Sequence, residues 1–131
     1  MSRAILFFIC CCTILEGHYT AQDIVRAARK QIGITKEYDP SYEKLAYPNG
    51  DVAIQKGVCS DVVIRTLRKV GIDLQKEIKE SILRSPKQYK NYWGCSMPDS
   101  NIDHRRVPNL LTYFRIRGWE LKNNTLQNQE T

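Results

Sequence analysis

The fold of this chain is decided at residues 57–65, which read GVCSDVVIR. A turn glycine precedes a cysteine, and the apolar residues that follow predict a helix that starts at Cys59 and ends at Gly71. One face of this helix carries Val63, Leu67 and Val70. Backbone N–H groups at a helix N-terminus lack intrahelical partners and carry partial positive charge, which favours a thiolate. Cys59 is therefore the first candidate nucleophile.

The same apolar period of about 3.6 residues, with glycine or proline as stop signals, predicts three more helices. They span residues 21–32, 74–83 and 108–117. Between residues 34 and 57 the period lapses and turn signals dominate, so we expect a long loop with at most short extended pieces.

With 131 residues, 42% hydrophobic and 26% charged, the chain has room for one ordinary globular domain. Residues 1–20 have a basic start and an apolar run of signal-peptide length, too short for a spanning helix. We expect the domain over residues 21–121 and a polar, disordered tail over 122–131. The leader predicts a periplasmic or secreted protein.

The net charge is +6 and the pI is near 9.1, with acidic and basic residues interspersed along the chain. Such a mildly cationic surface suits an anionic partner such as cell-wall polymer. No groove-reading or base-stacking motif accompanies Arg105 and Arg106, so nucleic acid is not an expected partner. We expect a monomer that needs no cofactor.

The cysteines leave a structural alternative open. In an oxidising compartment Cys59 and Cys95 can form a disulfide, which would make Cys59 a structural residue. No C-x-x-C pair is present, and only His18 and His104 could join the thiols, so no metal site is predicted.

Five separated phrases of the sequence resemble the bacterial domain-of-unknown-function 1287 family, which is related to the NlpC-type, papain-like murein peptidases. They are ARKQIG (28–33), YDPSY (38–42), LAYPNGDV (45–52), GVCSDVVIR (57–65) and NIDHRRVPNL (101–110). The resemblance implies an exported α+β domain of papain-like, NlpC-type fold, in which Cys59 opens a helix packed on a small antiparallel sheet. It also implies cleavage of amide bonds in peptidoglycan peptides.

In such enzymes the thiolate attacks a carbonyl, a histidine on a sheet strand relays the proton, and backbone N–H groups stabilise the oxyanion. The family pattern continues after the helix at 108–117 with a Gly-Asp turn, further strands and a His-Ile-Gly-like strand. This chain stops soon after Leu121. We therefore expect a C-terminally truncated domain without most of its sheet, with apolar helix faces exposed around Val63, Leu67, Ile78 and Phe114.

Two interpretations of the catalytic base remain open: no base is present, or His104, flanked by Asp103, takes that role. Asp61 either caps the helix or orients a histidine. The candidate substrate-binding residues are Arg105 and Arg106, as carboxylate ligands, and Trp93, as a groove-wall aromatic.

The leading functional hypothesis is a cell-wall amidase or endopeptidase with a cysteine nucleophile, whose activity the truncation could abolish. The alternatives are a non-catalytic remnant or murein-binding protein, and a redox or disulfide-stapled structural protein.

Overall fold

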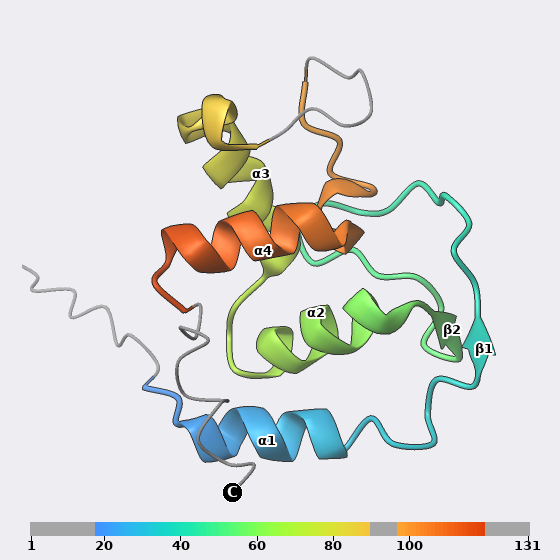
Figure 1. The fold of residues 1–131 in the computed structure, drawn as a ribbon. Helices are drawn as coiled ribbons and strands as arrows, with labels where there is room; N and C mark the ends of the chain where they lie inside the picture. The colour runs from blue at the N-terminus through green and yellow to red at the C-terminus, as the bar shows by residue number, and fades with distance from the viewer. Residues whose placement is uncertain (1–17, 90–96, 120–131) are drawn as a thin grey trace, which may run out of the picture.

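The computed structural model describes residues 18–89 and 97–119, and these ranges form an α+β arrangement of four α-helices with a two-stranded sheet (Figure 1). The elements are α1 (Ala21–Arg29), β1 (Glu37–Tyr38), β2 (Lys56–Gly57), α2 (Cys59–Lys69), α3 (Leu74–Arg84), the 3₁₀ turns η1 (Pro86–Gln88) and η2 (Asp103–Arg105), and α4 (Val107–Ile116). No helix within these ranges is both long and apolar enough to cross a membrane.

The predicted helices are confirmed, with small shifts at their ends. α2 starts at Cys59 as expected, whereas α1 ends at Arg29, before the predicted boundary at Ile32. Ile32 is 81% exposed, so no packing supports another helical turn there. Gln31 instead donates from Nε2 to the Val62 carbonyl at 3.0 Å and to Thr66 Oγ1 at 2.7 Å.

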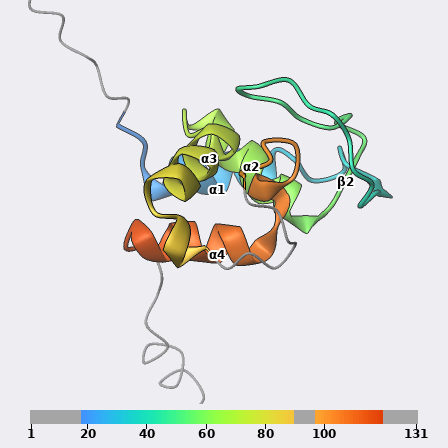
Figure 2. The same ribbon diagram turned by 90° about the horizontal axis from the view of Figure 1, so that it is seen from above.

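The core lies where α2, α3 and α4 meet. Its buried members are Ile64, Leu67, Leu74, Ile78, Leu110 and Tyr113. α2 packs against α1 on one side and α3 on the other, while α4 packs against α3 and η2. The view from above shows α4 along one edge of this helical layer and the strands at its end (Figure 2).

The expectation of exposed apolar helix faces is wrong at two of its four positions. Leu67 is 7% exposed and Ile78 is fully buried, because both side chains belong to the core cluster in which α2, α3 and α4 pack together. Phe114 is partly buried against the same cluster. Val63 is 38% exposed, as expected.

The sheet differs from the one that the resemblance implies. β1 and β2 pair in parallel, with Glu37 opposite Lys56 and Tyr38 opposite Gly57. Parallel pairing requires the chain to cross over between the strands, and the long loop over residues 39–55 supplies that connection. Only two residues of each strand pair, as the expected short extended pieces suggested.

A buried arginine holds the last part of this loop to α2. Arg65 donates to both carboxylate oxygens of Asp51, at 2.8 and 3.1 Å, and to Thr35 Oγ1 at 2.7 Å. Its guanidinium also lies 3.2–3.5 Å from the carbonyl oxygens of residues 52, 53, 54 and 56. The loop that leads to Cys59 is therefore fixed by a residue of the helix that follows it.

The middle of the loop is held by Gln75 of α3, which is 1% exposed. Its Oε1 accepts from the Gly50 N–H, and its Nε2 donates to the carbonyl oxygens of Ala46 and Ser100, all at 2.9 Å. Both polar atoms of the side-chain amide therefore bind backbone groups, as is usual for a buried amide. This single side chain joins the loop to the segment that precedes η2.

Candidate active site around Cys59

Cys59 is the first residue of α2, and its side chain is exposed, with a thiol that is free among the described residues. It follows β2 after one extended residue, Val58, which is the N-cap of the helix. The thiol therefore lies at the end of α2 where backbone N–H groups lack intrahelical acceptors. The structure places Cys59 where the sequence predicted it.

The Asp61 carboxylate binds two partners that compensate its negative charge. Its Oδ2 accepts from the Val58 N–H at 2.7 Å, which caps the helix. Arg105 of η2 donates from Nε to Oδ1 and from Nη2 to Oδ2, both at 2.9 Å. The two side chains are each 3% exposed. Asp61 is paired with an arginine, and no hydrogen bond joins it to His104 in the described ranges.

Gly57 makes room for this carboxylate. Its φ is +152°, and a Cβ at this position would stand 2.6 Å from Asp61 Oδ2. Both the backbone conformation and the close approach favour glycine. The glycine at position 57 thus has a geometric cause, which is that the Asp61 side chain turns back to the Val58 N–H at the start of the helix.

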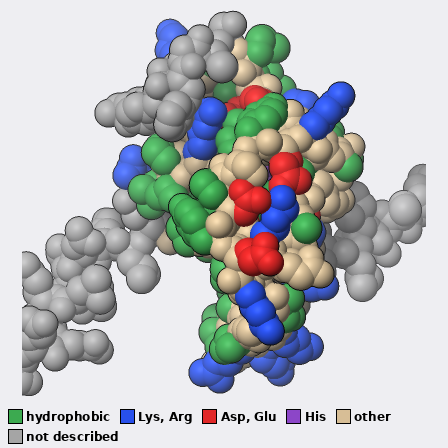
Figure 3. Space-filling model, turned by 90° about the vertical axis from the view of Figure 1, so that its right-hand side faces the viewer, with side chains coloured by type: hydrophobic (Ala, Val, Ile, Leu, Met, Phe, Trp, Pro, Cys, Tyr) green, Lys and Arg blue, Asp and Glu red, His purple; other side chains and the backbone are tan. Residues whose placement is uncertain are grey.

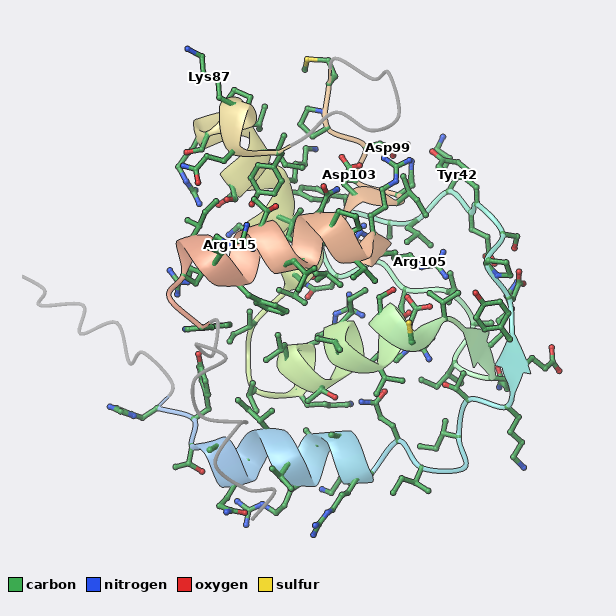
Figure 4. All side chains as sticks on the ribbon, viewed as in Figure 1. Tyr42, Lys87, Asp99, Asp103, Arg105 and Arg115 are labelled. Carbon is green, nitrogen blue, oxygen red and sulfur yellow. The ribbon has the colours of Figure 1, made fainter. Side chains whose placement is uncertain are left out.

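η2 is fastened to α2 at a second point. Ser60 Oγ donates to the Arg105 carbonyl oxygen at 2.8 Å, and Arg105 Nη1 donates to the Ser41 carbonyl oxygen at 3.3 Å. Hydrogen bonding to Asp61 raises the pKa of Arg105, so the guanidinium stays charged. Figure 4 shows Arg105 reaching from η2 toward the start of α2.

His104 lies beside this pair but is buried, with 2% of the residue exposed. Burial, together with the smaller effect of the positive charges of Arg105 and Arg68, lowers its pKa to about 4. The imidazole is therefore neutral at pH 7. Its Nδ1 is buried and has no hydrogen-bond partner among the described residues. No hydrogen bond connects it to the Cys59 thiol in these ranges.

The other candidate residues are placed as follows. Arg106 donates from Nη1 to Asp103 Oδ1 at 3.0 Å, so it binds an internal carboxylate, as Arg105 does. Burial raises the pKa of Asp103. Trp93, and Cys95 with its possible disulfide to Cys59, lie outside the described residues.

A polar cluster next to η2 completes the surroundings of the site. Tyr42 donates from its hydroxyl to Asp99 Oδ2 at 3.0 Å and accepts from Asn101 Nδ2 at 2.8 Å. Asp99 donates from its backbone N–H to Asp103 Oδ2. Figure 4 shows Tyr42, Asp99 and Asp103 gathered at this end of α4. The long loop and the η2 segment are thus held together beside the start of α2.

Sequence reasoning missed Arg65 and Gln75, which hold the loop that leads to Cys59. An arginine or glutamine on a helix with a polar face is usually solvated, and nothing local marks these two as buried. The turn residues between 39 and 51 could have indicated them, because the backbone groups of such an irregular segment need hydrogen-bond partners from side chains.

Comparisons with known proteins match this chain to one family model and to one uncharacterized relative. The family described as "Domain of unknown function (DUF1287)" matches residues 25–130. The uncharacterized protein YijF of Escherichia coli (strain K12) is 55% identical over 91 residues, which cover 70% of this chain and 44% of that protein. This chain thus spans less than half the length of that relative. No solved structure matches this chain.

Proposed function

This chain belongs to the DUF1287 family, and from that membership and the position of Cys59 we propose that it is a cysteine-type amidase or endopeptidase acting on peptidoglycan peptides. The observation that carries the proposal is the exposed, free thiol at the first position of α2. A structural cysteine is normally buried, whereas a nucleophile has to reach its substrate.

The charge balance around the thiol supports this role. An unpaired carboxylate two residues from a cysteine would disfavour the thiolate. Here Arg105 and the Val58 N–H neutralise Asp61 through three hydrogen bonds. In our proposal Asp61 and Arg105 are positioning residues. They hold the first turn of α2 in place, and Arg105 offsets the negative charge of Asp61 so that it does not disfavour the Cys59 thiolate.

The proposed reaction is acyl transfer. Cys59 Sγ attacks the amide carbonyl and forms a carbon–sulfur bond, while the amine leaves with a proton, and water then hydrolyses the thioester. N–H groups in the first turn of α2 are candidates to stabilise the oxyanion. His104 is neutral and thus in the form that accepts a proton, but a pKa of about 4 makes it a weak base. We therefore expect slow turnover.

We further propose that α2 corresponds to the nucleophile-bearing helix of a papain-like, NlpC-type fold and that the protein acts in the periplasm or outside the cell. The support is the placement of a cysteine at a helix start, together with the leader-like residues 1–20. The +6 charge suits an anionic cell-wall polymer.

A specific observation favours a second candidate, a murein-binding protein without catalysis. In the described ranges no hydrogen bond joins Cys59 to a base, and Asp61 and Arg105 bind each other. Such a protein would bind sacculi through its cationic surface and release nothing.

Incubation with purified sacculi separates the two candidates. Hydrolysis predicts soluble muropeptides with newly exposed amino groups, and Cys59→Ser should abolish their release while leaving the fold intact. Thr112→Ala serves as a control, because it removes a hydroxyl of α4 that takes no part in the contacts of the α2 start. Sedimentation with sacculi but no release from the wild-type protein would reject the enzyme and support the binding protein.

A further inference from the structure

A concave site lies apart from Cys59. It is a cleft of about 810 Å³ between α1, the C-terminal half of α2 and the loop at residues 51–54. Small-molecule sites in proteins have about this volume. Along α2, Arg65 is the lining residue nearest to Cys59 in the sequence, and it lies six residues beyond it, which is about 9 Å at 1.5 Å per residue.

The cleft has an excess of positive charge. Its lining includes five basic residues, Arg26, Lys30, Arg65, Arg68 and Lys69, and two acidic ones, Asp23 and Asp51. Figure 3 shows Lys and Arg side chains gathered at the lower end of the molecule, at the height of α1 in Figure 1. A cleft lined by charges of one sign concentrates counter-ions.

Within the cleft, the three arginines form ion pairs with carboxylates, whereas the two lysines do not. Arg26 binds Asp23, and Arg65 and Arg68 share Asp51. Lys30 and Lys69 have no ion-pair partner among residues 18–89 and 97–119, and both are exposed. Two ammonium groups, one from the C-cap of α1 and one from the last residue of α2, are therefore available to a ligand.

The cleft also borders unsatisfied polar atoms. Arg68 Nε and Gln31 Oε1 are buried without a hydrogen-bond partner among the described residues, and both residues line the cleft. Such atoms in native proteins commonly bind an ordered water or ion. A ligand in the cleft could supply partners, directly or through an ordered water.

We propose that this cleft binds a small polyanion that carries at least two carboxylate or phosphate groups, with Lys30 and Lys69 as its principal ligands. Lysine ammonium groups act as point charges and accept either oxyanion geometry, whereas the arginine forks are already turned to Asp51. The site is separate from the proposed nucleophile, because Cys59, Asp61, His104 and Arg105 do not line it. Arg65, which holds the loop that leads to Cys59, forms part of its wall.

The test is titration of the full chain with citrate and with pyrophosphate at low ionic strength, followed by calorimetry. Lys30→Gln with Lys69→Gln should weaken binding about tenfold or more, because two charged hydrogen bonds are lost. The matched control is Lys44→Gln with Lys87→Gln, which removes the same charge from two exposed lysines outside the cleft. The control should bind within about twofold of wild type.

Binding of only one probe would still support the site and would show whether it prefers carboxylates or phosphates. The proposal fails if neither probe binds or if both double variants weaken binding equally. It also fails if the Lys30 and Lys69 variant binds like wild type, since these lysines would then only neutralise helix C-termini. Cys59→Ser should leave binding unchanged, so failure here is distinguishable from failure of the hydrolase proposal.

Discussion

Arg105 forms a bidentate ion pair with Asp61, in which Nε and Nη2 each donate to a different carboxylate oxygen at 2.9 Å. The residues are 44 positions apart, and each side chain is 3% exposed. Through this pair, η2 and the start of α2 form one unit.

Removing either partner of this pair should be strongly destabilising. We expect Arg105→Ala and Asp61→Ala each to lower the free energy of unfolding by about 3–5 kcal/mol, because the remaining charge stays buried without a partner. The double variant should lose much less than the sum of the two. Urea denaturation measures all three. The control is Arg26→Ala, which breaks an ion pair whose arginine is 70% exposed and should cost less than about 1 kcal/mol. Additive losses would show that the pair is not coupled.

Gly57→Ala should destabilise the protein by about 2–4 kcal/mol, since it combines an unfavourable φ with a contact to Asp61. Gly33→Ala isolates the backbone part, because Gly33 has φ +77° and no atom within 4 Å of an added Cβ. That variant should lose about 1 kcal/mol. Thermal unfolding of both variants gives the comparison. Equal losses would mean that the contact with Asp61 relaxes freely.

Cys59 should react with iodoacetamide in the native protein without reductant, because its thiol is exposed and free. Peptide mapping by mass spectrometry identifies the labelled residue among the five cysteines. Arg105→Gln should slow the reaction severalfold, since the Asp61 carboxylate then opposes thiolate formation. Adding Asp61→Asn to that variant should restore the rate. No labelling of native wild-type protein would instead support a disulfide.

Stability should fall in mild acid because of His104. Its pKa is about 4 in the folded protein and near 6.5 when unfolded, so the unfolded chain binds the proton more readily. The stabilisation is fully present above about pH 6.5 and is lost as the pH falls toward 4, by about 3 kcal/mol in total. Urea midpoints between pH 4.5 and 7 test this. His104→Gln should flatten that dependence, and an unchanged slope would assign it to other groups.

The helices could be predicted from sequence because their signals are local. α2, α3 and α4 follow an apolar period bounded by Gly71, Pro86 and Gly118. The end of α1 could not, because Ile32 continues the period but finds no surface to pack against. The position of Cys59 at the first residue of α2 could be predicted because the signals that start this helix are also local.

The partners of the candidate site residues could not be predicted, since they are set by tertiary packing. Asp61 was expected either to cap the helix or to orient a histidine, and it caps the helix while binding Arg105. Arg105 was proposed as a ligand for a substrate carboxylate, and it binds an internal one. Nothing in the local sequence indicates that His104 is buried with a lowered pKa.

The contacts of Arg65 have a consequence for how the molecule opens. Because one side chain of α2 holds Asp51, Thr35 and the carbonyl groups that follow Asp51, the loop cannot detach while α2 remains folded and Arg65 stays in place. In native-state hydrogen exchange, α2 and residues 51–56 should therefore belong to one cooperative unfolding unit, despite the irregular backbone of the loop. We therefore expect the amide groups of the segment before Cys59 to exchange as slowly as those of a helix, although its backbone is not helical.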